Sequence, residues 1–441
     1  MGPQLIDAKE PPVAGPALPS HSDIAPPPDD PGAFLAAQRS AYDDLVARGL
    51  KFDLTRGKPG PEQLDLSEAL LTLPTTHTSG GVDVRNYGGL EGLLGLRELF
   101  AELFGVQVSQ FVAQGNASLT LMKDVLVDCM LKGPVDGTPW KDQGPIKFLC
   151  PVPGYDRHHA LLEWLGIDMV PVPMQADGPD VAAVEALVKD DPSIKGMWLV
   201  PTYANPSGSV TEADKAARLA AMPTAASDFK ILWDNAYGLH HLTEVETKTA
   251  DIISLAAANG HPDRPIMFAS TSKITFAGAG VSFLAASERN VQWYLKHLGM
   301  GSIGPDKVNH LRHLEFFKDA DGVRAHMRKH AAIIKPKFDA VQEVLSTRLG
   351  AYPHIATWTE PIGGYFVSLD VLPGTASRVV QLAKEAGVAL TPAGASFPYG
   401  NDPQDTNIRL APTFPSLEEV RVAMEAVATC VLLAAAEKLA G

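Results

Sequence analysis

A lysine and a carboxylate lie 39 residues apart, each at the end of an apolar run with strand character. Lys273 follows the run 265–268 within a Ser/Thr-rich turn, and Asp234 ends the run 231–233. Tyr237 stands three residues after the carboxylate. A lysine amine forms a Schiff base with an aldehyde, and a buried carboxylate pairs with a protonated ring nitrogen. These residue types at this spacing predict a site for pyridoxal phosphate, with Lys273, Asp234 and Tyr237 as its catalytic residues.

Further side chains that suit this cofactor also follow strand-like runs. Hydroxyls in a turn and the free N–H groups at the start of a helix both bind phosphate. Asn205 begins an Asn-Pro-Ser-Gly turn, from which its amide could reach the ring oxygen, and Tyr155 could stack on the ring. Each motif also has a purely structural reading, as a turn or an N-cap. The predicted contacts are Ser270, Ser272, Asn116, Ala117, Ser118, Asn205 and Tyr155.

An arginine lies inside an apolar run, at position 409 of the segment 407–412. A buried guanidinium needs an anion, and a carboxylate held through two parallel hydrogen bonds fits it well. Arg409 is therefore predicted to bind a substrate carboxylate, with help from Asn205. The histidine pairs 158–159 and 240–241 are expected to pack or cap rather than to catalyse.

These residues must be positioned by an α/β fold. Between about residues 110 and 285 strand-like and helical runs alternate, which indicates a mostly parallel sheet covered on both faces. In such sheets ligands bind beyond the carboxyl ends of the strands. A long helix at 324–348, short strands and two further helices predict a second, smaller α/β domain. The expected divisions are a flexible Pro-rich tail (1–32), an N-terminal arm that forms part of the small domain (33–75), a large cofactor-binding domain (76–310) and a small C-terminal domain (311–441).

Bulk composition excludes several other classes. The 441 residues carry a net charge of -14, which argues against a nucleic-acid-binding surface. Three widely spaced cysteines give neither zinc spacing nor a disulfide framework, so we expect no metal and a reducing, cytoplasmic location. The N-terminus has no signal-peptide pattern and no run is long enough for a membrane helix. The tail, with nine prolines before residue 33, is expected to be flexible or to lie on a partner.

At these residues the chain resembles class I aminotransferases of fold type I. The motifs 205–208, 234–237 and 270–273 and the Arg409 run occur in that family's order, and the resemblance covers roughly residues 50 to 440. It implies a large domain with a mostly parallel seven-stranded sheet between helices. It also implies a homodimer with shared active sites, in which Tyr87 of the Asn-Tyr-Gly motif reaches the neighbouring subunit's cofactor phosphate.

Within the family, several short segments resemble the sequences of a divergent aspartate aminotransferase subgroup: 54–59, 115–119, 153–158 and 304–307. The chain also resembles MocR-type proteins, but no DNA-binding domain precedes the catalytic part.

One departure from the family concerns the residues that bind the cofactor's phosphate. The family's arginine eight residues after the lysine is replaced by Val281, so the cation is expected to come from Lys307, of this subunit or of its partner, or from Arg312. For the second carboxylate of a dicarboxylic substrate, Arg157 is the first choice, with Lys58 and Lys307 as alternatives. Gly57 is expected beside the substrate.

The sequence thus predicts a pyridoxal-phosphate aminotransferase that moves the amino group of aspartate or glutamate to 2-oxoglutarate or oxaloacetate by ping-pong kinetics. One alternative keeps the cofactor and changes the substrate to an aromatic amino acid, kynurenine or 2-aminoadipate, or changes the reaction to that of a β-lyase. Another is a non-catalytic ligand sensor on the same fold. The intact set of Lys273, Asp234, Tyr237 and Arg409 argues against the sensor.

Overall fold

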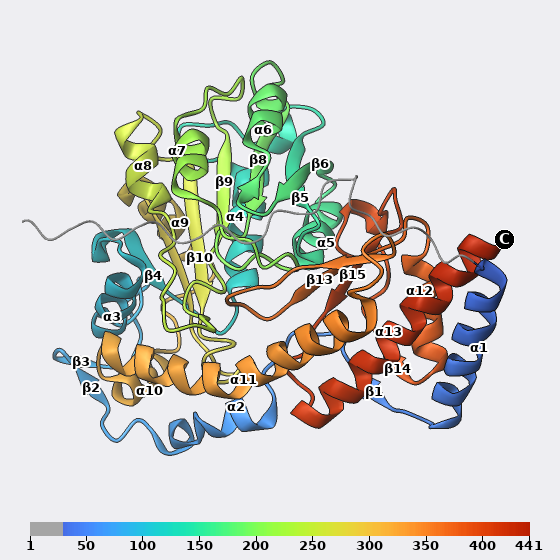
Figure 1. Ribbon diagram of the computed structural model, residues 1–441. Coiled ribbons are helices and arrows are strands. Elements are labelled where there is room, and N and C mark those ends of the chain that lie inside the picture. Colours follow the sequence, from blue (N-terminus) through green and yellow to red (C-terminus); the bar gives the residue numbers. More distant parts are fainter. Residues whose placement is uncertain (1–29) are drawn as a thin grey trace, which may run out of the picture.

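The computed structural model describes residues 30–441, which form two layered parts built on separate sheets (Figure 1). The larger part is an eight-stranded sheet with strand order β4-β11-β10-β9-β8-β5-β6-β7. Its strands are β4 (Phe111–Ala113), β5 (Lys147–Val152), β6 (Asp168–Gln175), β7 (Gly178–Pro179), β8 (Ile194–Leu199), β9 (Lys230–Asp234), β10 (Pro265–Ser270) and β11 (Ser282–Ala286).

Strand directions make this a mostly parallel sheet. β6, β5, β8, β9 and β10 run parallel to one another, and β11 lies antiparallel between β10 and β4. The expected seven strands are present, and the two-residue β7 adds an eighth by a hairpin with β6. The sequence has strand-like runs at 146–149, 168–172, 196–200, 230–233 and 266–268, and these are β5, β6, β8, β9 and β10, whereas the sequence does not predict β4, β7 or β11.

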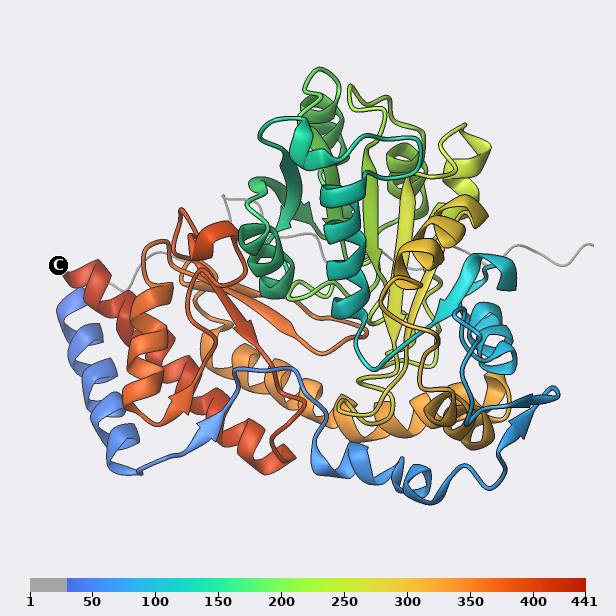
Figure 2. The ribbon, with the colours of Figure 1, turned by 180° about the vertical axis from the view of Figure 1, so that it is seen from behind.

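Helices cover both faces of this sheet, as Figures 1 and 2 show from opposite sides. One face packs on α4 (Ser118–Lys132), α5 (Asp156–Trp164) and α9 (Glu288–Leu298). The other packs on α3 (Leu94–Phe104), α6 (Val181–Val188), α7 (Ala213–Ala221) and α8 (Ile252–Ala258). Successive strand residues point to opposite faces, so in β9 Leu232 joins the first core and Ile231 and Trp233 the second. Both faces are therefore apolar, as a buried parallel sheet requires.

The smaller part contains the three-stranded antiparallel sheet β12-β13-β15: β12 (Ala356–Trp358), β13 (Val367–Val371) and β15 (Asn407–Leu410). It packs with α12 (Ala376–Glu385) and α13 (Leu417–Ala440). α1 (Pro31–Ala47) lies beside α13, and β1 (Phe52–Asp53) pairs with β14 (Val388–Ala389), so both ends of the described chain join this part. The long α11 (Ala320–Leu349) runs beneath both parts and follows α10 (Lys307–Phe317).

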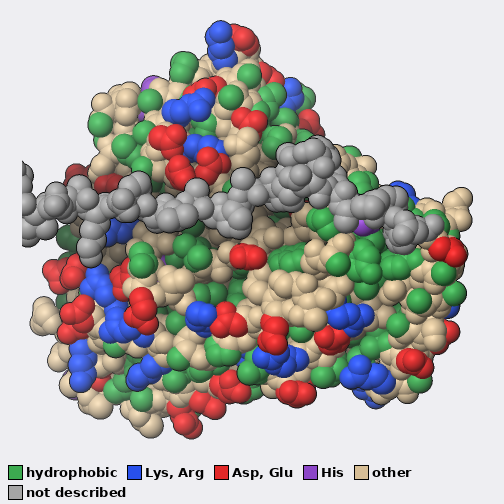
Figure 3. Space-filling model, viewed as in Figure 1, with side chains coloured by type: hydrophobic (Ala, Val, Ile, Leu, Met, Phe, Trp, Pro, Cys, Tyr) green, Lys and Arg blue, Asp and Glu red, His purple; other side chains and the backbone are tan. Residues whose placement is uncertain are grey.

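Local signals in the sequence explain several element boundaries. α3 ends at Gly105 with φ +68°, the left-handed conformation expected for a glycine at a helix end. α13 begins with a capping box between Ser416 and Glu419. Within residues 30–441 no helix is both long and apolar enough to cross a membrane. Acidic and basic side chains are interspersed over the face drawn in Figure 3.

Candidate active site

The carboxyl ends of the central strands bring the predicted cofactor residues to one edge of the large sheet. Asp234 ends β9 and is paired in register with Phe268 of the neighbouring β10, five residues before Lys273. Asn205 and Tyr155 follow β8 and β5 at the same edge. The start of α4, after β4, also lies there, because Ser282 at the beginning of β11 bonds to Gly115. The topology therefore assembles the residues as the sequence predicts.

Asp234 has one satisfied and one unsatisfied oxygen. The side chain is 4% exposed, and its Oδ2 accepts a hydrogen bond from Nε2 of His158 at 2.9 Å. Within the described chain, Oδ1 is buried with no hydrogen-bond partner. A buried carboxylate oxygen left without a donor is costly. This oxygen therefore fits a cationic N–H donor such as the protonated ring nitrogen of pyridoxal phosphate.

His158 packs, as the sequence predicts, and also makes a hydrogen bond that the sequence does not predict. Its ring stacks on Trp198 at 4.1 Å between centroids and 6° between planes, which fixes the ring while Nε2 donates to Asp234. His159 has a different environment, since burial lowers its pKa to about 4 and it makes no contact with Asp234 in the described hydrogen-bond network. The signal that could have identified His158 is its place in the first turn of a helix that starts at the carboxyl edge of the sheet.

Lys273 and Tyr237 lie together. The Nζ atom of Lys273 is 5.0 Å from the centroid of the Tyr237 ring. Tyr237 is 4% exposed, and its burial, with the nearby charge of Asp234, raises the pKa of its hydroxyl. The phenol therefore stays protonated and can donate a hydrogen bond. Tyr155 also faces this group: burial raises its pKa to about 12, and the nearby Lys273 opposes that shift.

The backbone of the lysine turn is held by a buried polar network that the sequence did not reveal. Tyr365 donates its hydroxyl to the carbonyl of Lys273 at 3.2 Å. His326 and His330, one turn apart on α11, place Nε2 at 2.8 and 2.9 Å from the carbonyl of Ile274. Gln63 bridges the two halves, with Nε2 at 2.9 Å from the Tyr365 hydroxyl and 3.0 Å from Nδ1 of His330. Residues distant in sequence thus fix the backbone position from which the Lys273 side chain projects.

The predicted phosphate region gathers N–H groups and hydroxyls. α4 begins at Ser118 with Ala117 as its N-cap, so the first N–H groups of the helix have no intrahelical partner. Ser272 donates its hydroxyl to the carbonyl of Asn116 at 2.9 Å and joins the lysine turn to this helix start. Ser270 accepts from the Ser272 N–H at 3.4 Å. Asn116 is exposed, which leaves the helix start accessible to an anion.

The position that carries an arginine in the family is apolar here. Val281 is fully buried, and its N–H donates to the Thr271 hydroxyl at 2.9 Å. Arg312, one suggested replacement, donates instead to the carbonyl of Leu73 at 2.9 Å and to Asn309 at 3.1 Å. Its guanidinium is therefore engaged elsewhere.

Arg409 lies in β15, and its guanidinium reaches across to the large sheet. The side chain is 6% exposed. NH1 pairs with Asp156 at 2.7 Å and lies 3.5 Å from the Asn205 amide oxygen. The guanidinium also lies 5.2 Å from the centroid of the Phe366 ring. Gly57 packs on the same ring, where a Cβ would come within 2.4 Å of it, so only glycine fits.

Within the described chain, four predicted residues make no hydrogen bond to Lys273, Asp234 or Arg409. Tyr87 is 82% exposed. Lys307 is buried and donates to the carbonyls of Asn86 and Gly88, on both sides of Tyr87, so it supports that loop. Arg157 is exposed on α5, and Lys58 lies 3.8 Å from the centroid of the Phe414 ring.

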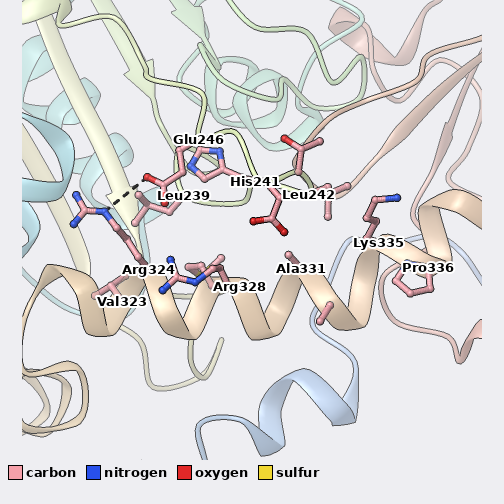
Figure 4. A pocket seen from close by; sticks show the side chains of 14 residues that line it. Leu239, His241, Leu242, Glu246, Val323, Arg324, Arg328, Ala331, Lys335 and Pro336 are labelled. Atoms are coloured by element: carbon pink, nitrogen blue, oxygen red, sulfur yellow. Dashed lines mark ion pairs between the residues drawn. The ribbon is translucent and has the colours of Figure 1, made fainter.

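A separate cavity of about 370 Å³ contains none of these side chains. It lies between the loop 239–246 and α11, and Figure 4 shows Glu246 facing Arg324 across it, 3.7 Å apart. Acidic side chains on the loop face basic ones on the helix, so the cavity favours no one sign of ligand charge.

Comparison with known proteins agrees with this geometry. Residues 28–441 match the family model described as aspartate amino-transferase. An aminotransferase of Mycolicibacterium smegmatis is 57% identical over 94% of this chain and 98% of its own length. The crystal structure of an aspartate transaminase from Corynebacterium glutamicum superposes with a TM-score of 0.91 at 52% identity, covering 92% of this chain and 97% of that one.

A more distant structure shows the same fold with a derivative of the cofactor bound. It is the α-aminoadipate aminotransferase of Thermus thermophilus, complexed with N-(5'-phosphopyridoxyl)-L-leucine, with a TM-score of 0.71 at 21% identity over 92% of this chain and 98% of that one. The match across residues 28–441 and the edge that carries Lys273 and Asp234 lead to one conclusion: the chain belongs to the aspartate aminotransferase family and is a fold type I aminotransferase that uses pyridoxal phosphate.

Proposed function

We propose that this aminotransferase acts on aspartate or glutamate, with 2-oxoglutarate or oxaloacetate as the amino-group acceptor. The observation that carries the proposal is the buried Arg409 beside Asn205, a site for one carboxylate at the edge where Lys273 and Asp234 meet. The similarity to an enzyme named as an aspartate transaminase supports the choice of substrate.

Each site residue has a proposed task. When bound, pyridoxal phosphate supplies an aldehyde that takes up the amino group and a ring that draws electrons from the substrate Cα. Asp234, held by His158, keeps a proton on the ring nitrogen. Tyr237 and Asn205 would donate hydrogen bonds to the ring oxygen, and Tyr155 would stack on the ring. The Ser270 hydroxyl and the helix start at 116–118 would bind the phosphate, and the Ser272 hydroxyl would join them by turning from the Asn116 carbonyl to the phosphate.

The substrate steps rest on Arg409 and Lys273. The guanidinium of Arg409 binds the α-carboxylate and so orients the Cα–H bond. The amine of Lys273 would then take the Cα proton and deliver it to the cofactor's former aldehyde carbon, on the other side of the transferred nitrogen, acting first as base and then as acid. Two such half-reactions, one for each keto acid, give ping-pong kinetics.

For the second carboxylate we propose Arg157, with Lys58 as the alternative. Both are exposed cations on segments that adjoin the site: Arg157 follows Tyr155 and Asp156, and Lys58 follows Gly57. Arg157→Ala tests this. A loss of kcat/KM confined to aspartate and glutamate supports the dicarboxylate role. Equal losses across amino acids, or none, assign the role to another residue, and Lys58→Ala is then the next variant.

We also propose a homodimer with active sites shared between subunits. Exposed apolar residues gather around the Tyr87 loop: Met300 is 83% and Ile303 is 64% exposed, and the Ile303 carbonyl accepts from the Gly88 N–H at 3.1 Å. In this arrangement the Tyr87 side chain would reach the partner's phosphate. Lys307, whose ammonium is held by the carbonyls of Asn86 and Gly88, would position the Tyr87 loop and bring the positive charge that Val281 cannot provide. A cytoplasmic location is proposed as well, because Cys129, Cys150 and Cys430 are all buried and free.

A further inference from the structure

An ion pair joins the two sheets at the proposed α-carboxylate site. Asp156, the first residue of α5 on the large sheet, places Oδ1 2.7 Å from NH1 of Arg409 in β15 of the small sheet. The side chain of Arg409 is 6% exposed and that of Asp156 is 34% exposed. The guanidinium of Arg409 is thus buried, whereas the carboxylate of Asp156 that pairs with it is partly exposed to solvent.

This pairing leaves the guanidinium incompletely satisfied. Within the described residues, the Nε atom of Arg409 is buried with no partner. NH2 makes only long contacts, 3.3 Å to Thr391 and 3.4 Å to the carbonyl of Thr55, and NH1 lies 3.5 Å from Asn205. Asp156 therefore supplies one short hydrogen bond. A free carboxylate that uses both oxygens would pair with the guanidinium more completely.

We propose that Asp156 is an internal occupant of the α-carboxylate site. Its carboxylate pairs with Arg409 in the substrate-free enzyme and is replaced there by the substrate's α-carboxylate. The inference rests on the proposed role of Arg409. It assigns to Asp156 a role in setting substrate affinity, which neither the cofactor residues nor the predicted specificity cations provide.

Two consequences follow for binding. The measured affinity for a carboxylate ligand is reduced by the fraction of enzyme in which Asp156 holds the site. The pair also bridges the two sheets before substrate arrives, so that the substrate takes over an existing bridge. Because Asp156 is already partly solvated, its release into water costs less than the release of a fully buried carboxylate.

The test uses the holoenzyme and succinate, a dicarboxylate without an amino group, with binding measured by titration calorimetry. Asp156→Asn keeps the shape of the side chain and removes its charge. Since hydrogen bonds to charged groups are strong, we expect succinate to bind this variant about tenfold more tightly. Asp156→Ala should do the same. Glu163→Gln, which removes an exposed charge farther along α5, is the matched control and should leave the dissociation constant unchanged.

Arg409→Gln distinguishes the proposed role of Arg409 in carboxylate binding from the proposed occupancy of that site by Asp156. If it leaves succinate binding unchanged, the proposed role of Arg409 fails and the inference fails with it. If it weakens binding while Asp156→Asn and Asp156→Ala fail to tighten it, the internal-occupant inference alone is wrong.

A crystal structure of the wild-type holoenzyme with succinate distinguishes replacement from a general effect of charge. We expect a succinate carboxylate within hydrogen-bond distance of Arg409, and Asp156 turned away from it. A structure in which Asp156 and succinate both contact Arg409 would overturn the replacement.

Discussion

His158 donates a hydrogen bond to one oxygen of Asp234 and leaves the other oxygen for the cofactor. Because the His158 ring is stacked on Trp198, its orientation is fixed, and so is the direction in which its Nε2–H points. Since a carboxylate oxygen accepts, the shared proton resides on Nε2 of the histidine. The pair therefore orients a carboxylate that would otherwise be free to rotate.

Removing this histidine should weaken both turnover and cofactor retention. The loss of a buried hydrogen bond to a charged group costs about 1.5–3 kcal/mol, so His158→Ala is expected to lower kcat by about 10- to 100-fold. The variant should also lose its visible absorbance on dialysis faster than the wild type does. His159→Gln is the control, because within the described chain His159 makes no hydrogen bond to Asp234. Equal effects of both substitutions would argue that His158 only packs.

The network behind Lys273 should affect turnover more than binding. Tyr365→Phe removes one hydroxyl, which donates to the Lys273 carbonyl and accepts from Gln63. We expect kcat to fall by about tenfold with little change in KM, because the amine is misplaced while Arg409 is untouched. Steady-state kinetics with a single amino acid as substrate measure kcat and KM separately. A rise in KM at unchanged kcat would show that Tyr365 acts on substrate binding instead.

Buried histidines should make stability depend on pH. Burial lowers the pKa of His310, His313 and His330 to about 4, against about 6.5 in the unfolded chain. The unfolded state then binds more protons between these values, so their contribution to stability is present above pH 6.5 and is lost as pH falls towards 4. The midpoint temperature of thermal unfolding of the holoenzyme should therefore fall steadily as the pH is lowered from 6.5 to 4.

His310 offers a variant for the same measurement. Its Nδ1 accepts from the Leu93 N–H and its Nε2 lies 2.9 Å from the Gln114 carbonyl, so protonation of Nδ1 breaks the first bond. His310→Gln should reduce the slope of the unfolding midpoint between pH 6.5 and 4, whatever its effect on stability at neutral pH. An unchanged slope would assign the pH dependence to other groups.

The proposed dimer depends on the apolar surface around Tyr87. Ile303→Glu places a charge in that surface and should shift the protein towards a monomer in sedimentation velocity, with weaker cofactor binding. Val245→Glu is the matched control, because Val245 is 74% exposed and belongs to the loop 239–246 beside α11. A monomeric Ile303→Glu variant with full activity would contradict the sharing of active sites.

The sequence predicted the groups that end strands and missed the groups that reach them from elsewhere. Asp234 and Lys273 each follow an apolar run, so their meeting at one sheet edge follows from parallel topology alone. His326, His330 and Gln63 lie on other elements, and only tertiary packing brings them to the lysine turn. The pairing of Arg409 with Asp156 could not be predicted either, because it depends on how the two sheets are placed.

Strand prediction failed for a similar reason. β4 has only three residues, and β11 contains two alanines, so neither shows the β-branched alternation that marks a strand. Both are strands because neighbours pair with them on the sheet: β11 bonds β10 on one side and β4 on the other.

The most direct test is the visible absorbance of the purified holoenzyme before and after addition of L-aspartate. The account predicts a yellow band from the cofactor linked to Lys273, which bleaches with aspartate and returns with 2-oxoglutarate. Lys273→Ala should show neither this linkage nor turnover. A yellow band that is indifferent to aspartate and glutamate would contradict the proposed substrates. A protein that gains no band when supplied with pyridoxal phosphate would contradict the central claim.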